Sequence, residues 1–283
     1  MNEERGRMFT AKVGDLNIYY EVHGKGEPLL LIMGYGANSQ WWYRQVPAFS
    51  QDYKVIIFDN RGTGRSDKPD APYTMAMMAG DAAGLLEAIG IEAAHVFGVS
   101  MGGMIAQELA LGYPEKVLSL ILGCTTPGGR NTVLPDNEAL TFLFDHERRR
   151  QLPLEEQAKE LLPFLFSQDF LDKNRNLLGD FISHAFEHIT PLHGYQRQGE
   201  AINSYNVYDR IPEITAPTLV ITGTGDRLIP AENSRILASR IPNAELVLFE
   251  NVGHGFTGEV PEESNSAVLD FLRRHSHSRK ALA

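Results

Sequence analysis

The feature that most constrains the fold is an alternation of short apolar segments with longer segments of helical period. Apolar runs of five to eight residues fall at 16–23, 29–33, 54–58, 94–98, 117–124, 218–222 and 245–249. Segments with helical spacing lie at 40–49, 75–89, 101–112, 231–241 and 261–275. Several apolar runs have no polar alternation, which is typical of strands buried on both faces of a parallel sheet. The pattern predicts a doubly wound α/β fold, with helices on both faces of a mostly parallel sheet.

The alternation stops between about residues 127 and 212, where the apolar spacing is helical only. So long a block without a strand is best interpreted as an inserted helical lid. We therefore expect one core made of residues 1–126 and 213–283, interrupted by a lid at 127–212 and ending in a flexible tail at 275–283. We expect most apolar lid residues to pack the lid, and the others to line an apolar substrate cavity.

Composition excludes several classes of partner. The chain of 283 residues has a net charge of −10, which opposes binding to the phosphate backbone of nucleic acids. Its longest apolar run, residues 29–33, is far too short to cross a bilayer, and its charged first residues do not form a secretory signal. The single cysteine, Cys124, forms no internal disulfide and fits a reducing compartment. We therefore expect a cytoplasmic protein without a nucleic-acid or membrane partner.

The strongest chemical signal is Gly98-Val99-Ser100-Met101-Gly102, where an apolar strand runs directly into a helix. A serine on so sharp a turn has a strained backbone, and its neighbours two residues away must be small. Gly98 and Gly102 meet that requirement. The free N–H groups and the positive dipole end of the helix also favour negative charge beside Ser100.

Two further loops carry the groups that a nucleophilic serine requires. A serine hydroxyl needs a base to take its proton, and the base needs an acid to orient it. Asp226 follows the run at 218–222, and His254 follows the run at 245–249. Because the carboxyl ends of parallel strands share one edge of a sheet, we expect Ser100, Asp226 and His254 to lie at the same rim.

Five segments in this order resemble the α/β-hydrolase family over essentially the whole chain. They are Leu-Leu-Leu-Ile-Met-Gly-Tyr-Gly at 29–36, Asp-Asn-Arg-Gly-Thr-Gly-Arg-Ser at 59–66, the Ser100 turn, the Asp226 loop and the His254 loop. The resemblance is closest to the lidded esterases and enol-lactonases. It implies an α/β-hydrolase fold in which Ser100 is the nucleophile, His254 the general base and acid, and Asp226 the orienting carboxylate.

The resemblance also implies an oxyanion hole formed by the backbone N–H groups of Tyr35 and Met101. One such donor typically contributes about 3 kcal/mol to lowering the barrier. Gly34 and Gly36 let the chain turn tightly enough for the Tyr35 amide to point inward. Many relatives have a histidine before the first of these glycines, whereas this chain has Met33, so the hydrogen bonds of that histidine are absent.

Around this centre, Gly34, Trp41 and Trp42 are candidate substrate-binding residues. The two tryptophans have two interpretations, packing of a helix or a wall of the acyl pocket. The implied reaction is hydrolysis of a small, largely apolar ester or lactone by water through an acyl-enzyme, with no metal or organic cofactor. Carbon–carbon bond hydrolysis, perhydrolysis and acyl transfer use the same triad, and a small-molecule receptor of this fold is an alternative of another class.

Three other groups of residues are alternatives to the triad. His184-Ala-Phe-Glu187-His188 has the H-x-x-E-H spacing of some zinc sites, but such a match arises easily in a helical lid, and we expect no metal there. Asp59 and Arg61 belong to a loop that is mainly structural in the family. Glu250 is an alternative acid for His254; we favour Asp226, because its loop fits the family position and Glu250 directly ends a strand.

Overall fold

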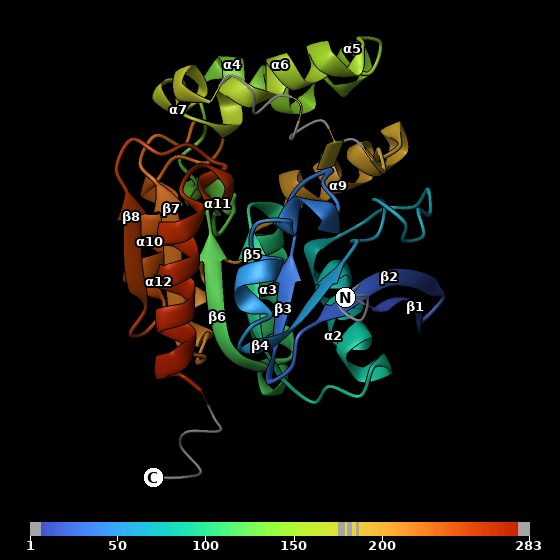
Figure 1. The fold of residues 1–283 in the computed structure, drawn as a ribbon, viewed down its shortest axis with the longest axis vertical. Helices are drawn as coiled ribbons and strands as arrows, with labels where there is room; N and C mark the ends of the chain where they lie inside the picture. Colours follow the sequence, from blue (N-terminus) through green and yellow to red (C-terminus); the bar gives the residue numbers. More distant parts are fainter. Residues whose placement is uncertain (1–6, 175–178, 180–182, 185–186, 277–283) are drawn as a thin grey trace.

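Eight strands form one sheet, in the order β1-β2-β4-β3-β5-β6-β7-β8 (Figure 1). The structure is a computed structural model that describes residues 7–174, 179, 183–184 and 187–276. The strands are β1 (Arg7–Val13), β2 (Leu16–His23), β3 (Glu27–Ile32), β4 (Tyr53–Phe58), β5 (Ala94–Val99), β6 (Val117–Gly123), β7 (Thr218–Gly223) and β8 (Glu245–Phe249). β2 pairs antiparallel with β1 and β4, and the other pairs are parallel. The predicted α/β fold with a mostly parallel sheet is confirmed.

The edge strand β1 was not predicted from the sequence. It pairs with β2, and Val13 at its end lies opposite Leu16. The two-residue connection between them begins with Gly14, which has φ +55°. A Gly-Asp pair between two strands is a recognised hairpin signal, so Gly14-Asp15 is the feature that identifies this strand.

The helix predicted at 40–49 is divided into two short helices. These are the 3-10 helix η1 (Ser39–Trp42) and α1 (Val46–Phe49). Pro47 lies in the first turn of α1 and has no N–H to donate to the carbonyl four residues earlier. One continuous helix through this position is therefore disfavoured, and α1 begins anew after η1.

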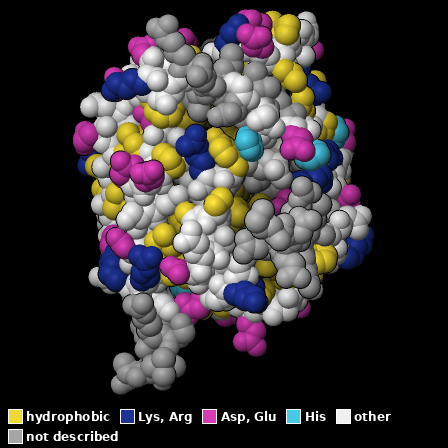
Figure 2. All heavy atoms as spheres, viewed as in Figure 1, with side chains coloured by type: hydrophobic (Ala, Val, Ile, Leu, Met, Phe, Trp, Pro, Cys, Tyr) yellow, Lys and Arg dark blue, Asp and Glu magenta, His cyan; other side chains and the backbone are white. Residues whose placement is uncertain are grey.

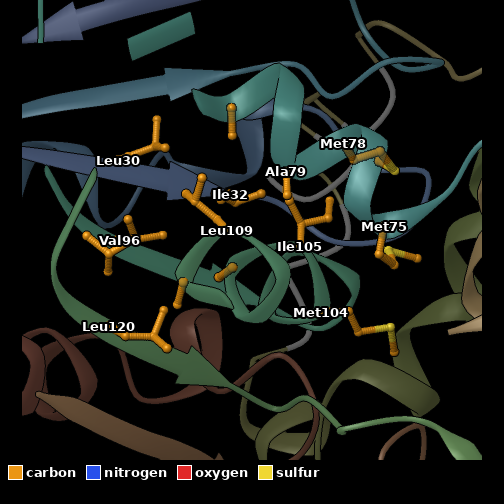
Figure 3. Close-up of a cluster of buried hydrophobic side chains, with 14 of the residues drawn as sticks. Leu30, Ile32, Met75, Met78, Ala79, Val96, Met104, Ile105, Leu109 and Leu120 are labelled. Carbon is orange, nitrogen blue, oxygen red and sulfur yellow. The ribbon is translucent and has the colours of Figure 1, made fainter. Parts of the chain in front are cut away.

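Both faces of the sheet are covered by helices, because successive strand residues point to opposite sides. On one face, Leu30 and Ile32 of β3 pack with Ile105 in a cluster shown in Figure 3. On the other, Leu31 packs in a cluster with Phe271. Each fully buried aliphatic side chain contributes about 1.5–3 kcal/mol. The first face carries α2 (Met75–Ala88), α3 (Met101–Gly112) and α10 (Glu232–Arg240), and the second carries α1, α11 (Phe256–Glu259) and α12 (Pro261–Arg274).

Helices between β6 and β7 lie beyond the carboxyl ends of the strands. In Figure 1 the arrows of β3 and β6 point toward this group. Several of these helices share a separate hydrophobic cluster, which includes Phe142, Leu162 and Phe164 and takes in Leu228 from the loop after β7, whereas the last helix contributes Ala201 to the cluster on the first face of the sheet. We call them the cap helices: α4 (Asn137–Phe144), α5 (His146–Arg149), α6 (Leu154–Leu165), α7 (Gln168–Lys173) and α9 (Leu192–Ser204).

The charged side chains show no concentration of one sign on the face seen in Figure 2, where acidic and basic groups are interspersed. Among the residues that the structure describes, no helix combines the length and the apolar character needed to cross a membrane.

Candidate active site

Ser100 lies on a strained turn between β5 and α3. Its backbone has φ 56° and ψ −125°, in a region that L-residues rarely occupy. The flanking glycines make the turn possible: a Cβ on Gly98 would lie 2.2 Å from the Gly102 carbonyl oxygen, and one on Gly102 would lie 2.1 Å from the Ile32 carbonyl oxygen. The Ser100 amide donates to the Gly123 carbonyl at 2.8 Å, which fixes the turn to β6. The local sequence thus places Ser100 at the edge of the sheet formed by the carboxyl ends of the parallel strands.

The loop after β3 lies against Ser100. A Cβ on Gly34 would be 3.0 Å from the Ser100 Cβ and 3.4 Å from its Oγ, so only a glycine leaves this space open. Within the described part of the chain, neither the Tyr35 amide nor the Met101 amide donates a hydrogen bond to a protein acceptor. The Tyr35 amide, next to Gly34, and the Met101 amide, next to Ser100, are therefore both uncommitted within the described structure.

His254 and Asp226 form a buried pair. Nδ1 of His254 is 2.7 Å from Oδ2 of Asp226, and the other carboxylate oxygen accepts from the amides of Leu228 and Ile229, each at 2.8 Å. The carboxylate is held from three directions, and it fixes the proton of His254 on Nδ1, which leaves Nε2 for the cavity.

Burial and charge act on His254 in opposite directions. Burial lowers the pKa of His254, but the Asp226 carboxylate and the adjacent Cys124 sulfur outweigh it and raise this pKa above its usual range. The charged imidazolium, which forms when a serine gives up its proton, is therefore stabilised.

Cys124 lies beside the free nitrogen of His254. Its sulfur is 3.9 Å from Nε2 of His254, and its backbone has φ 40° at the end of β6. In the described chain, ligand atoms of Cys124, Asp226 and His254 all fall within 4.8 Å of one another, close enough to share a metal ion. The Asp226 oxygens are already bound by His254 and by two amides, so a metal would have to displace these hydrogen bonds.

One cavity of about 200 Å³ brings the predicted groups together. Ser100, His254, Tyr35 and Gly34 all line it, while Asp226 lies behind His254. Cap residues such as Phe142, Leu161 and Leu165 form much of the remaining wall. The lining is not entirely apolar, because the cap also contributes His146, Arg149, Arg150 and Tyr195. The expectation of an apolar pocket is corrected in this respect.

The two tryptophans take different positions. Trp41 lines the cavity. Trp42 has no exposed surface, and its ring lies 5.2 Å from the ring of Phe97 within the core. The expectation for Trp42 as a substrate-binding residue is therefore corrected: neighbouring side chains of η1 point in different directions, and this one faces the sheet.

The alternative constellations lie elsewhere. The Asp59 carboxylate is fully buried and accepts from Ser39 and Arg65, which gives it a structural environment outside the cavity. Glu250 is exposed and accepts from the Thr224 hydroxyl at 3.3 Å. The ring of His184 stacks on Tyr43 at 4.1 Å, whereas residues 185–186 of the H-x-x-E-H segment are outside the described residues.

The cap also holds the loop that carries Tyr35. The Gly36 amide donates to Oε1 of Gln198 at 2.9 Å, and the Gly36 carbonyl accepts from the Thr190 hydroxyl at 2.8 Å. Because Gln198 follows Gly36 by more than 160 residues in the chain, no local pattern could have shown this contact. These cap residues were missed by sequence reasoning for that reason.

Comparison with known proteins gives consistent results. A family model described as the alpha/beta hydrolase fold matches residues 27–257. A relative from Stutzerimonas stutzeri that carries the name carbamate hydrolase RutD is 31% identical, over 90% of this chain and 96% of its own. An esterase from Thermogutta terrifontis superposes with a TM-score of 0.81 at 25% identity, covering 95% of this chain and 99% of that one. The enol-lactonase from Burkholderia xenovorans LB400 gives a TM-score of 0.81 at 26% identity, covering 94% and 100%.

Proposed function

Because the chain belongs to the α/β-hydrolase fold family, we propose that it is a serine hydrolase that cleaves a carboxylic ester or lactone of a small molecule. The observation that carries this proposal is the buried His254–Asp226 pair, joined at 2.7 Å, whose histidine lines the same cavity as a serine on a strained turn. The names of the similar esterase and enol-lactonase support the choice of ester and lactone chemistry.

In the proposed mechanism, Ser100 attacks the substrate carbonyl while Nε2 of His254 takes its proton. Asp226 orients the imidazole and stabilises its charged form through the hydrogen bond to Nδ1. The amides of Tyr35 and Met101 bind the oxyanion, since neither is committed to another described acceptor. His254 then protonates the leaving alcohol or enol, and water attacks the acyl-enzyme to release the acid and free Ser100. None of these steps calls for a cofactor.

We also propose that residues 127–212 act as a lid over this centre. The cap helices supply cavity residues such as Phe142 and Leu161, and α4 and α6 pack around a cluster that is separate from the two sheet clusters. A lid with its own core can select the substrate without altering the triad. A cytoplasmic location remains a prediction from composition.

Carbamate cleavage is a second candidate, because the similar bacterial relatives bear that name. A carbamate carbonyl can be attacked by the same serine and bound by the same two amides. Parallel assays of esters, lactones and carbamates decide between the substrates.

The proposal is tested by Ser100→Ala. The control is Ser239→Ala, an exposed serine whose hydroxyl donates to the Ile236 carbonyl within α10. We expect Ser100→Ala to lose hydrolysis of p-nitrophenyl esters and labelling by a fluorophosphonate, while the control retains both. Retained turnover in Ser100→Ala would refute the triad. A receptor would instead show a single slow covalent step and no repeated turnover.

A further inference from the structure

The cavity has a charge opposite to that of the protein as a whole. The chain carries a net charge of −10. Yet among the described residues that line the cavity there are two arginines, Arg149 and Arg150, and no aspartate or glutamate. Both arginines lie at or just after the end of α5, so the positive charge belongs to the cap and not to the catalytic sheet.

Arg149 is not neutralised by a neighbouring acid. The nearby carboxylates of Asp145 and Glu160 are bound by Arg148 instead, through Nε at 2.6 Å and Nη2 at 2.7 Å. Among the described residues, no carboxylate oxygen lies within 4.0 Å of the Arg149 guanidinium. Arg148 is thus the exposed, paired arginine and Arg149 the partly buried, unpaired one.

Hydrogen bonds hold Arg149 in place. Its Nη2 donates to Nδ1 of His146 at 2.8 Å, and since arginine only donates, the proton of a neutral His146 must be on Nε2. That Nε2 donates to the Tyr35 hydroxyl at 2.7 Å, which donates in turn to the Tyr195 carbonyl at 3.0 Å. The donor and the acceptor of each hydrogen bond in this series are therefore fixed. Together these hydrogen bonds orient the guanidinium relative to the loop that carries the proposed oxyanion amide.

Donors remain available on Arg149. It has five N–H groups, and within the described structure only two are used, by His146 and by the Asp145 carbonyl. The Phe142 ring lies 3.8 Å from the guanidinium carbon and supports it from one face. Burial lowers the pKa of Arg149, so an anion in the cavity would offset the cost of burying its charge.

We propose that Arg149 binds a carboxylate of the substrate, so that the substrate of this site is a small ester or lactone with an apolar body and one carboxylate. The inference rests on the proposed function, because it concerns the substrate of the same centre. A planar guanidinium with free N–H groups is suited to bidentate recognition of a carboxylate, and the mostly apolar wall suits the remainder of the molecule.

The test uses p-nitrophenyl monoesters of adipic, pimelic and suberic acid, each beside the same compound with its free carboxyl capped as a methyl ester. Wild-type enzyme should prefer the charged member at one or more lengths. Arg149→Gln should lower kcat/KM for that member about tenfold or more, mainly through KM, and should change the capped partner less than about threefold. Arg149→Lys should retain part of the preference, because it keeps the charge.

The control is Lys159→Gln, which removes an exposed cation of the cap helix α6 that pairs with Glu155 and Glu156 and does not line the cavity. It should leave the preference unchanged. If wild-type enzyme prefers the capped esters at every length, or if Arg149→Gln slows both members of each pair equally, Arg149 is a structural residue and the inference is wrong.

A second arm does not require turnover. Calorimetry measures the binding of adipate, pimelate and suberate to Ser100→Ala and to the double variant with Arg149→Gln. The site is supported if Ser100→Ala binds a dicarboxylate and the double variant binds it at least tenfold more weakly. This result holds even if Ser100→Ala proves active and the triad proposal fails. Equal affinities overturn the carboxylate site and leave the triad result unaffected.

Discussion

The carboxylate of Glu259 accepts a hydrogen bond from the Gly253 amide at 3.0 Å. Gly253 immediately precedes His254, so the acid of α11 holds the loop that carries the histidine. The same carboxylate also accepts from the amide of Ser167 at 3.0 Å and from its hydroxyl, at the start of α7. One side chain thus connects the His254 loop to the cap.

Glu259→Ala should therefore affect both stability and catalysis. Hydrogen bonds to a charged group contribute about 1.5–3 kcal/mol, so we expect the free energy of unfolding to fall by about 2 kcal/mol. We also expect a lower kcat, because His254 loses its support. Urea unfolding and ester hydrolysis measure the two effects. Glu263→Ala, on the exposed side of α12, should leave both near wild type; equal losses in the two variants would contradict the prediction.

Asp226→Asn tests which acid orients the histidine. An amide in place of the carboxylate no longer stabilises the imidazolium and favours the wrong tautomer, so we expect kcat to fall by about 10⁴ with little change in KM. Glu250→Gln is the matched control, since Glu250 contacts Thr224 at the surface. If Glu250→Gln were the variant that lost activity in steady-state ester assays, the assignment of the acid would be reversed.

Gly36→Ala should displace the loop that carries Tyr35. A Cβ there would lie 1.9 Å from Cε1 of Tyr195, and the backbone has φ +66°. We expect kcat to fall by about 10²–10³, the effect of losing one oxyanion donor. Gly14→Ala is the control for backbone strain without a clash. Gly14 also has a positive φ, of +55°, but an added Cβ there would meet nothing within 4 Å. It should cost about 1 kcal/mol of stability and no activity; similar kcat values for both variants would refute this account.

The free energy of unfolding should fall as the solution becomes acidic, because His146 has a lowered pKa in the folded protein. Burial, with a further contribution from Arg149, lowers the pKa of His146 to about 4, whereas an unfolded histidine titrates near 6.5. Between these values the unfolded chain binds a proton that the folded protein does not, so stability is lost as the pH falls from about 6.5 toward 4. Urea unfolding at pH 7, 6 and 5 measures this slope, which His146→Gln should reduce. An identical slope in wild type and variant would exclude His146 as its source.

The sequence by itself determined the sheet, its helices and the turn at Ser100. These follow from patterns within short segments: apolar runs that suit strands buried on both faces, and glycines on each side of Ser100 where a Cβ has no room. The helix at 101–112 and the strands at 16–23 and 245–249 accordingly have the predicted bounds. The strand order required more, because pairing joins segments that compete for the same neighbours, whereas the edge strand β1 was missed although Gly14-Asp15 is a local signal for it.

Only the tertiary structure decided how the cap meets the sheet. Tyr35 and His146 are 111 positions apart, and the hydrogen bond between them depends on how α5 rests over the loop after β3. The same docking places Arg149 in the cavity and leaves Arg148 in solvent, although the two are adjacent in the chain. Sequence spacing predicts which face of an element is apolar, but the identity of the side chain that reaches a distant loop is set by packing between elements. The residues of the proposed triad could therefore be chosen from sequence patterns, and the polar wall of the cavity could not.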